Sequence, residues 1–222
     1  MATLIFDYDG TLHNTKRLYG SSFRVAYKRL VEDGYAPVHE YSDDDVAKYL
    51  GVSAPDMWQD FMPQLPTEIK KKASRIIGQE MVNGVNAGRA SLFEGVTESL
   101  DELKKEGYRL LILSNCHKSY MDAHCSFLRL DRWFDGYFCA ESYGFIPKES
   151  IFPDIRVRFP DSAYIMIGDR GSDFRVGTVN GIPTIGCLYG FGTDEERKVC
   201  TALVSSPYEW RTAAEGILKQ LP

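Results

Sequence analysis

The sequence predicts an α/β fold with a central parallel β-sheet and an all-helical insertion near the N-terminus. Short apolar runs recur at 3–6, 110–113 and 164–167, and each ends at a small or acidic residue. Amphipathic helical patterns alternate with the later runs, as in a doubly wound sheet. The segment 14–90 breaks this alternation, because it contains helical patterns and no convincing strand.

The composition is that of an ordinary globular protein, and the charge excludes some function classes. The chain has 222 residues, of which 44% are hydrophobic and 26% charged, so a core sufficient for folding is available. With 26 Lys and Arg against 31 Asp and Glu, the net charge is −5. No broad positive field favours nucleic acid or an anionic membrane surface. A small anionic substrate is not excluded, because a local pocket can be positive inside an acidic protein.

We expect a cytoplasmic protein, on three grounds. No apolar run approaches the roughly 20 residues that span a bilayer. The start, MATLIFDYDG, lacks the basic region of a signal peptide. The five cysteines are scattered without CxxC spacing, which is typical of free thiols in a reducing compartment. From size alone we expect a monomer or weak homodimer.

The first strand is expected within 2–7, where a run that is apolar on both faces suits a central parallel strand. Further strands are expected at 110–113, 164–167 and 184–188, and weaker ones at 136–140 and 202–204. Val96, Leu100 and Leu103 recur at helical spacing before the second strand. Gly107 follows them where a helix C-terminal cap is expected.

Four helical patterns fill the insertion. Ser42 and Asp45 resemble a capping box. Pro55 suits the first turn of a short helix, and Thr67 suits the N-cap of the last one. The apolar positions of these helices are Phe23, Tyr27, Leu30, Val31, Val46, Tyr49, Leu50, Met57, Trp58, Phe61, Ile69, Ala73, Ile76 and Ile77. We interpret them as a local core.

The segment 7–12, DYDGTL, is the most informative motif and follows the first strand directly. The carboxyl end of such a strand faces the crevice where open α/β sheets bind ligands. A turn at Gly10 can hold the carboxylates of Asp7 and Asp9 over one point. One carboxylate can then act as a nucleophile while the other transfers a proton. An acidic turn that only ends a strand is the alternative.

A second acidic pair lies in 168–173, GDRGSD, again after an apolar strand. Parallel strands end at one edge, so Asp169 and Asp173 are expected near Asp7 and Asp9. Four carboxylates in one crevice repel each other unless a cation lies among them. Oxygen ligands beside a phosphate favour Mg²⁺ over Zn²⁺. N-capping of a helix by Asp173 is the alternative.

Two weaker signals complete the set. Ser114 and Asn115 follow the strand at 110–113, where a hydroxyl and free backbone N–H groups can hold phosphate oxygens. Lys148 has chemical meaning only if the fold carries it into the carboxylate cluster.

These motifs resemble those of the haloacid dehalogenase (HAD) superfamily of hydrolases. Four segments stand in the family's order, namely DYDGTL at 7–12, SN at 114–115, Lys148 and GDRGSD at 168–173. Residues 190–193, GFGT, resemble a late loop of the phosphoglycolate-phosphatase-like branch. The likeness implies a HAD-like Rossmannoid core at 1–13 and 91–222 and a helical cap at 14–90, which closes over the site and selects the substrate.

The resemblance also implies a Mg²⁺-dependent phosphatase that hydrolyses a small phosphomonoester through an aspartyl-phosphate. Asp7 is implied as the nucleophile, Asp9 as the general acid/base and Lys148 as the charge-balancing residue. The implied phosphate-binding residues are Gly10, Thr11, Ser114 and Asn115. The implied Mg²⁺ ligands are Asp7, the backbone carbonyl of Asp9, Asp169 and, directly or indirectly, Asp173. Phosphoglycolate, sugar phosphates, nucleotides and pyrophosphate all remain open as substrates.

Three other functions stay open. A 2-haloacid dehalogenase would generally lack the second acid, because a halide leaves without a proton, so Asp9 favours phosphate chemistry. A sugar phosphomutase of the β-phosphoglucomutase type shares the acids and the cap. A non-enzymatic binding or sensor module would be expected to lose Asp7, Asp9 or Lys148, and all three are present.

Two further residues, at the two acidic motifs, are not assigned a catalytic role. His13 stands where the family more often has an apolar residue, and we interpret it as a hydrogen-bonding residue at the cap hinge. Arg170, like Arg17 and Arg24, could contact a second anionic group, but surface placement is expected for each.

Overall fold

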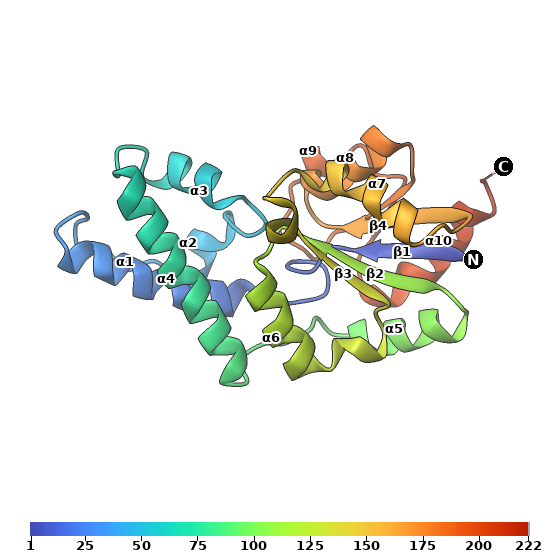
Figure 1. Ribbon diagram of the computed structural model, residues 1–222, viewed down its shortest axis with the longest axis horizontal. Coiled ribbons are helices and arrows are strands. Elements are labelled where there is room, and N and C mark those ends of the chain that lie inside the picture. The colour runs from blue at the N-terminus through green and yellow to red at the C-terminus, as the bar shows by residue number, and fades with distance from the viewer. Residues whose placement is uncertain (222) are drawn as a thin grey trace.

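Six parallel strands form one sheet in the computed structural model, which describes residues 1–221. The strand order is β3-β2-β1-β4-β5-β6 (Figure 1). The bounds are β1 (Ala2–Phe6), β2 (Arg109–Ser114), β3 (Gly136–Cys139), β4 (Ala163–Gly168), β5 (Thr184–Cys187) and β6 (Ala202–Val204). The α/β fold and each predicted strand are confirmed.

Helices cover both faces of this sheet (Figure 1). One face packs on α5 (Val96–Lys105), α6 (Lys118–Leu128) and α10 (Trp210–Leu218), and the other on α7 (Lys148–Arg158) and α8 (Gly171–Asn180). Shorter helices are α9 (Asp194–Arg197), η1 (Leu130–Arg132), η2 (Ala140–Tyr143) and η3 (Pro207–Glu209). Leu4 and Phe6 enter one layer and Ile5 the other, so the central strand is apolar on both faces, as predicted.

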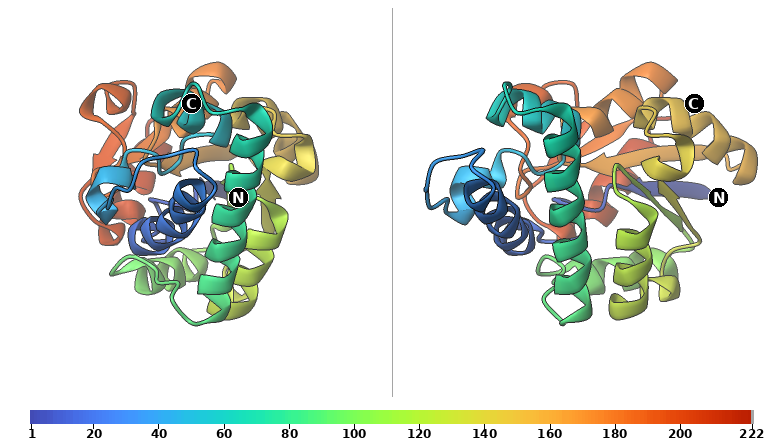
Figure 2. Two further views of the ribbon diagram at one scale, coloured as in Figure 1. Left: turned by 90° about the vertical axis from the view of Figure 1, so that its left-hand side faces the viewer. Right: turned by 60° about the vertical axis from the view of Figure 1, so that its left-hand side comes forward.

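Four helices lie between β1 and α5, namely α1 (Lys16–Glu32), α2 (Asp43–Ala47), α3 (Ala54–Phe61) and α4 (Thr67–Asn86). They gather beyond the carboxyl edge of the sheet, with α1 and α4 side by side (Figures 1 and 2). Their buried side chains, among them Phe23 and Trp58, form a separate hydrophobic cluster. The domain boundaries at 13/14 and 90/91 stay a prediction. No helix within residues 1–221 is long and apolar enough to cross a membrane.

The helix termini agree with the sequence in part. The capping box forms, because the Asp45 N–H donates to Ser42 Oγ and the Ser42 N–H donates to the Asp45 carboxylate. The prediction that Thr67 caps the last helix is wrong, because Thr67 is already its first helical residue and Pro66 occupies the cap. The fixed φ of Pro66, −55°, starts the helix there without a side-chain cap bond.

The register of the sheet determines where the acidic motifs lie. Phe6 has Ile112 of β2 and Ile167 of β4 as its register partners. Asp7 lies one residue beyond this row and Asp169 two residues beyond it. Both acidic motifs therefore leave the sheet at the same edge, beneath the helical insertion.

Candidate active site

Three carboxylates and one ammonium meet at the carboxyl edge of the sheet. Lys148 Nζ donates to Asp7 Oδ1 at 2.5 Å and to Asp173 Oδ1 at 2.6 Å. One oxygen each of Asp7, Asp169 and Asp173 lies within 4.8 Å of the others. All four side chains are buried. The fold thus brings Lys148 together with acidic residues of both motifs, 7–12 and 168–173.

Helix starts hold two of these groups in place. Lys148 is the first residue of α7, after the extended Pro147. Asp173 lies in the first turn of α8, where its Oδ2 accepts the backbone N–H groups of Asp169 and Arg170 at 3.1 and 3.0 Å. Arg170, not Asp173, is the N-cap residue of α8, and Asp173 accepts the N-cap N–H from the third helical position with one oxygen while the other binds Lys148.

The cluster is short of positive charge, because three carboxylates against one ammonium leave a net charge of −2. Burial raises the pKa of Asp7 well above its usual range, and Asp173 adds to this although Lys148 opposes it. Burial, and then Asp173, raise the pKa of Asp169 to about 7. Burial would lower the pKa of Lys148, but the two carboxylates raise it overall. A further cation would stabilise the ionised carboxylates.

The donor set fits a small hard dication. The donor set consists of carboxylate oxygens alone. Two glycines lie so close to Asp169 that a side chain at either position would collide with it. A Cβ at Gly10, whose φ is +94°, would lie 2.5 Å from Asp169 Oδ2, and one at Gly190 would lie 2.3 Å from Asp169 Cβ. The Phe191 N–H donates to Asp169 Oδ2 at 2.6 Å. This oxygen-only chemistry suits Mg²⁺ and not Zn²⁺.

Asp9 lies outside this carboxylate cluster. Its Oδ1 accepts hydrogen bonds from Thr15 at 2.6 Å, Tyr120 at 2.8 Å and His13 Nδ1 at 2.9 Å. Burial by itself would raise the pKa of Asp9, but the hydrogen bond and field of His13, with the Thr15 hydrogen bond, lower it overall. The hinge interpretation of His13 was therefore incomplete, since this buried ring binds the second acid of the motif.

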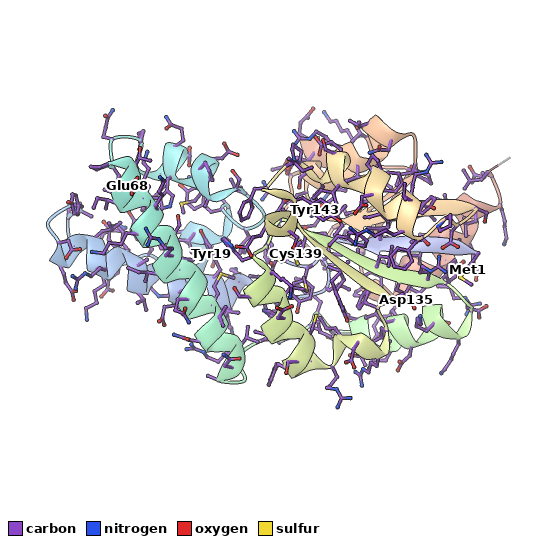
Figure 3. All side chains as sticks on the ribbon, in the orientation of Figure 1. Met1, Tyr19, Glu68, Asp135, Cys139 and Tyr143 are labelled. Atoms are coloured by element: carbon purple, nitrogen blue, oxygen red, sulfur yellow. The ribbon has the colours of Figure 1, made fainter. Side chains whose placement is uncertain are left out.

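The predicted phosphate-binding residues occupy different settings. Ser114 is buried at the end of β2, and its register partner is Cys139 at the end of β3, which is labelled in Figure 3. Asn115 is exposed. The Gly10 N–H donates to the His13 carbonyl, and the Thr11 hydroxyl lies 3.5 Å from Asp169 Oδ1. Phosphate contacts by these four residues stay a prediction.

The sequence did not indicate that Tyr120 belongs to the site or that Arg170 is largely buried. Tyr120 lies on α6, 111 residues from Asp9, and its only signal was a polar side chain on the buried face of a helix. Arg170 is largely buried, which contradicts its expected surface position. It donates to the Leu50 carbonyl of the insertion and to Glu196 Oε1. Arg170 thus forms a hydrogen bond between the carboxyl edge of the sheet and the helical insertion.

Comparison with known proteins agrees with this geometry. The sequence matches the haloacid dehalogenase-like hydrolase family over residues 4–187. A pyrophosphatase, PpaX, of Bacillus cereus is 29% identical over 134 residues, which cover 60% of this chain and 56% of that protein. This chain therefore matches just over half the length of that relative.

Solved structures show the same fold. A predicted phosphatase from Clostridium acetobutylicum superposes with a TM-score of 0.83 at 20% identity, covering 97% of this chain and 98% of the other. A predicted phosphoglycolate phosphatase from Haemophilus somnus has a TM-score of 0.78 at 19% identity, covering 96% and 97%. The family match spans most of the sequence, and Asp7, Lys148, Asp169 and Asp173 meet at one buried cluster. The chain therefore belongs to the haloacid dehalogenase-like hydrolases.

Proposed function

We propose that this protein is a Mg²⁺-dependent phosphatase that hydrolyses a small phosphomonoester through an aspartyl-phosphate. The observation that supports this most is the bridge from Lys148 to Asp7 and Asp173, with Asp169 beside it. This arrangement holds a buried carboxylate next to positive charge, which an attack on a phosphate dianion requires.

In this proposal Lys148 binds Oδ1 of Asp7, which leaves Oδ2 to attack phosphorus. The bond from phosphorus to the leaving oxygen breaks as the new bond forms, and Asp9 donates a proton to that oxygen. Asp9 then accepts a proton from a water whose oxygen bonds to phosphorus as the bond from phosphorus to Asp7 Oδ2 breaks, which releases inorganic phosphate and regenerates the Asp7 carboxylate. Mg²⁺, held by Asp7, Asp169 and Asp173 with the Asp9 carbonyl, would supply neutralisation of the phosphate charge.

The substrate class follows from the resemblance and from the names of relatives. A curated relative is named a pyrophosphatase, and a structural neighbour is named a predicted phosphoglycolate phosphatase. Both names denote small phosphorylated compounds, so we propose a substrate of that size. We further propose a cytoplasmic monomer or weak homodimer.

Release of inorganic phosphate from a panel of small phosphomonoesters and pyrophosphate tests the proposed function. We expect release that needs Mg²⁺ and that Asp7→Asn abolishes. Transfer of phosphate to a second sugar position would instead favour a phosphomutase, and halide release from 2-haloacids a dehalogenase. No turnover in any of these assays would favour a binding module.

Asp9→Asn is expected to lower kcat/KM for alkyl phosphates by about a hundredfold to ten-thousandfold, because a poor leaving group needs the proton. The loss should be much smaller for 4-nitrophenyl phosphate, whose leaving group departs as an anion. Comparing kcat/KM for the two esters checks this expectation. Equal losses on both would assign Asp9 a different main role.

Removal of Mg²⁺ by a chelator is expected to stop turnover, and added Mg²⁺ to restore it. The same ion should raise the Tm of the chelated protein, because it binds the folded carboxylate cluster. Asp169→Asn should abolish most of that Tm increase, whereas Asp194→Asn, an exposed control, should retain it. Full activity in excess chelator would contradict the proposed metal site.

A further inference from the structure

Hydrogen-bond donors from two distant parts of the chain converge on one oxygen of Asp9. Thr15 and His13 come from the segment that leads into α1, and Tyr120 comes from α6. His13 Nδ1 also lies 3.0 Å from Thr15 Oγ1 and 3.2 Å from the Tyr120 hydroxyl. The three hydrogen bonds to the Asp9 carboxylate all end at Oδ1, and within residues 1–221 Asp9 Oδ2 has no hydrogen-bond partner.

A packed aromatic layer holds these donors. His13 is fully buried, stacks on Tyr8 with ring centroids 5.5 Å apart, and meets His124 edge-on at 4.5 Å. The Tyr120 and His124 rings lie 4.3 Å apart. The Tyr8 hydroxyl lies 2.6 Å from His124 Nδ1. Buried rings in such contact cannot reorient singly without opening a void.

Burial, with the neighbouring His13, lowers the pKa of His124 to about 3. The neutral His124 ring shares a hydrogen bond with the Tyr8 hydroxyl through Nδ1. His124 and Tyr8 thus pack against His13 and Tyr120, and all four polar side chains are buried.

We propose that Tyr120 and His13 are positioning residues that hold Asp9 by Oδ1, so that Oδ2 alone is presented for proton transfer. The inference rests on the proposed phosphatase function. A general acid must lie within hydrogen-bond reach of the leaving oxygen, and a carboxylate free to rotate spends less time there. Loss of one supporting donor should therefore impair the step that needs the proton and spare the step that does not.

Tyr120→Phe removes one donor and keeps the ring. We expect kcat/KM for an alkyl phosphate to fall by about tenfold to a hundredfold, the usual effect of losing an outer hydrogen bond to a site group. We expect kcat/KM for 4-nitrophenyl phosphate to fall by less than about threefold, because its leaving group needs little protonation. The ratio of the two values is the readout, since a loss of folded protein lowers both equally.

Tyr164→Phe is the matched control. Tyr164 is equally buried, and its hydroxyl donates to the Phe159 carbonyl at the opposite edge of the sheet. This variant should leave the ratio of kcat/KM values at the wild-type value. An unchanged ratio in Tyr120→Phe, or a ratio altered as much by Tyr164→Phe, would overturn the inference.

A pair of variants at His13 provides an independent test if Tyr120→Phe fails to fold. Asn places an amide N–H near the position of Nδ1, whereas Leu removes the donor at similar volume. We expect His13→Leu to depress the alkyl phosphate selectively and His13→Asn to restore it in part. Equal ratios in both would refute the positioning role. Absence of Asp7-dependent release in the wild type would refute the proposed function itself, a separate outcome.

Discussion

Asp7→Asn is expected to lower phosphate release by at least about a thousandfold while the protein stays folded. A neutral amide is a poor nucleophile, and its carbonyl oxygen can still accept the hydrogen bond from Lys148. The substitution also removes one of three buried carboxylates that share a single ammonium. The Tm of the metal-free protein should therefore not fall, and phosphate release and thermal unfolding check the two halves of this expectation.

Asp161→Asn is the matched control. Asp161 is a partly buried residue whose carboxylate pairs with Arg109 at 2.5 Å, at the opposite edge of the sheet. The variant should lose stability and keep its turnover per folded molecule, the reverse of the pattern at Asp7. Turnover retained by Asp7→Asn would remove the nucleophile assignment.

Lys148→Met is expected to have the largest combined effect on activity and stability. The change leaves three buried carboxylates without their ammonium, and breaking a buried ion pair from one side costs about 3–5 kcal/mol. We expect the free energy of unfolding in chelator to fall by that amount and turnover to be lost, because nothing then holds Oδ1 of Asp7. Mg²⁺ should restore part of the free energy of unfolding, but not turnover, because it does not replace the hydrogen bond that orients Asp7.

Denaturant unfolding with and without Mg²⁺, beside a phosphate-release assay, measures these effects. Lys104→Met is a suitable control, because Lys104 pairs with Asp135 near the surface at 3.0 Å. Such a partly exposed pair contributes about 0–1 kcal/mol. If the two lysine variants unfold alike and Lys148→Met remains active, the buried bridge has no role in the site.

The sequence by itself determined the strands and the two acidic motifs. Buried parallel strands are apolar on both faces, and that pattern is local, so each strand could be read from its own residues. Asp7 and Asp169 follow such strands directly, so placing them at one sheet edge required only the parallel class. The insertion was equally readable as helical, although the start of its last helix was decided by Pro66 and not by Thr67.

Only the tertiary structure decided which distant side chains meet there. Lys148 lies 141 residues from Asp7, and Tyr120 lies 111 residues from Asp9, so no local pattern links the members of either pair. Their contacts depend on how α7 and α6 pack on opposite faces of the sheet. Local periodicity determines which face of an element is buried, whereas the partners of a buried polar group are determined by the packing of whole elements.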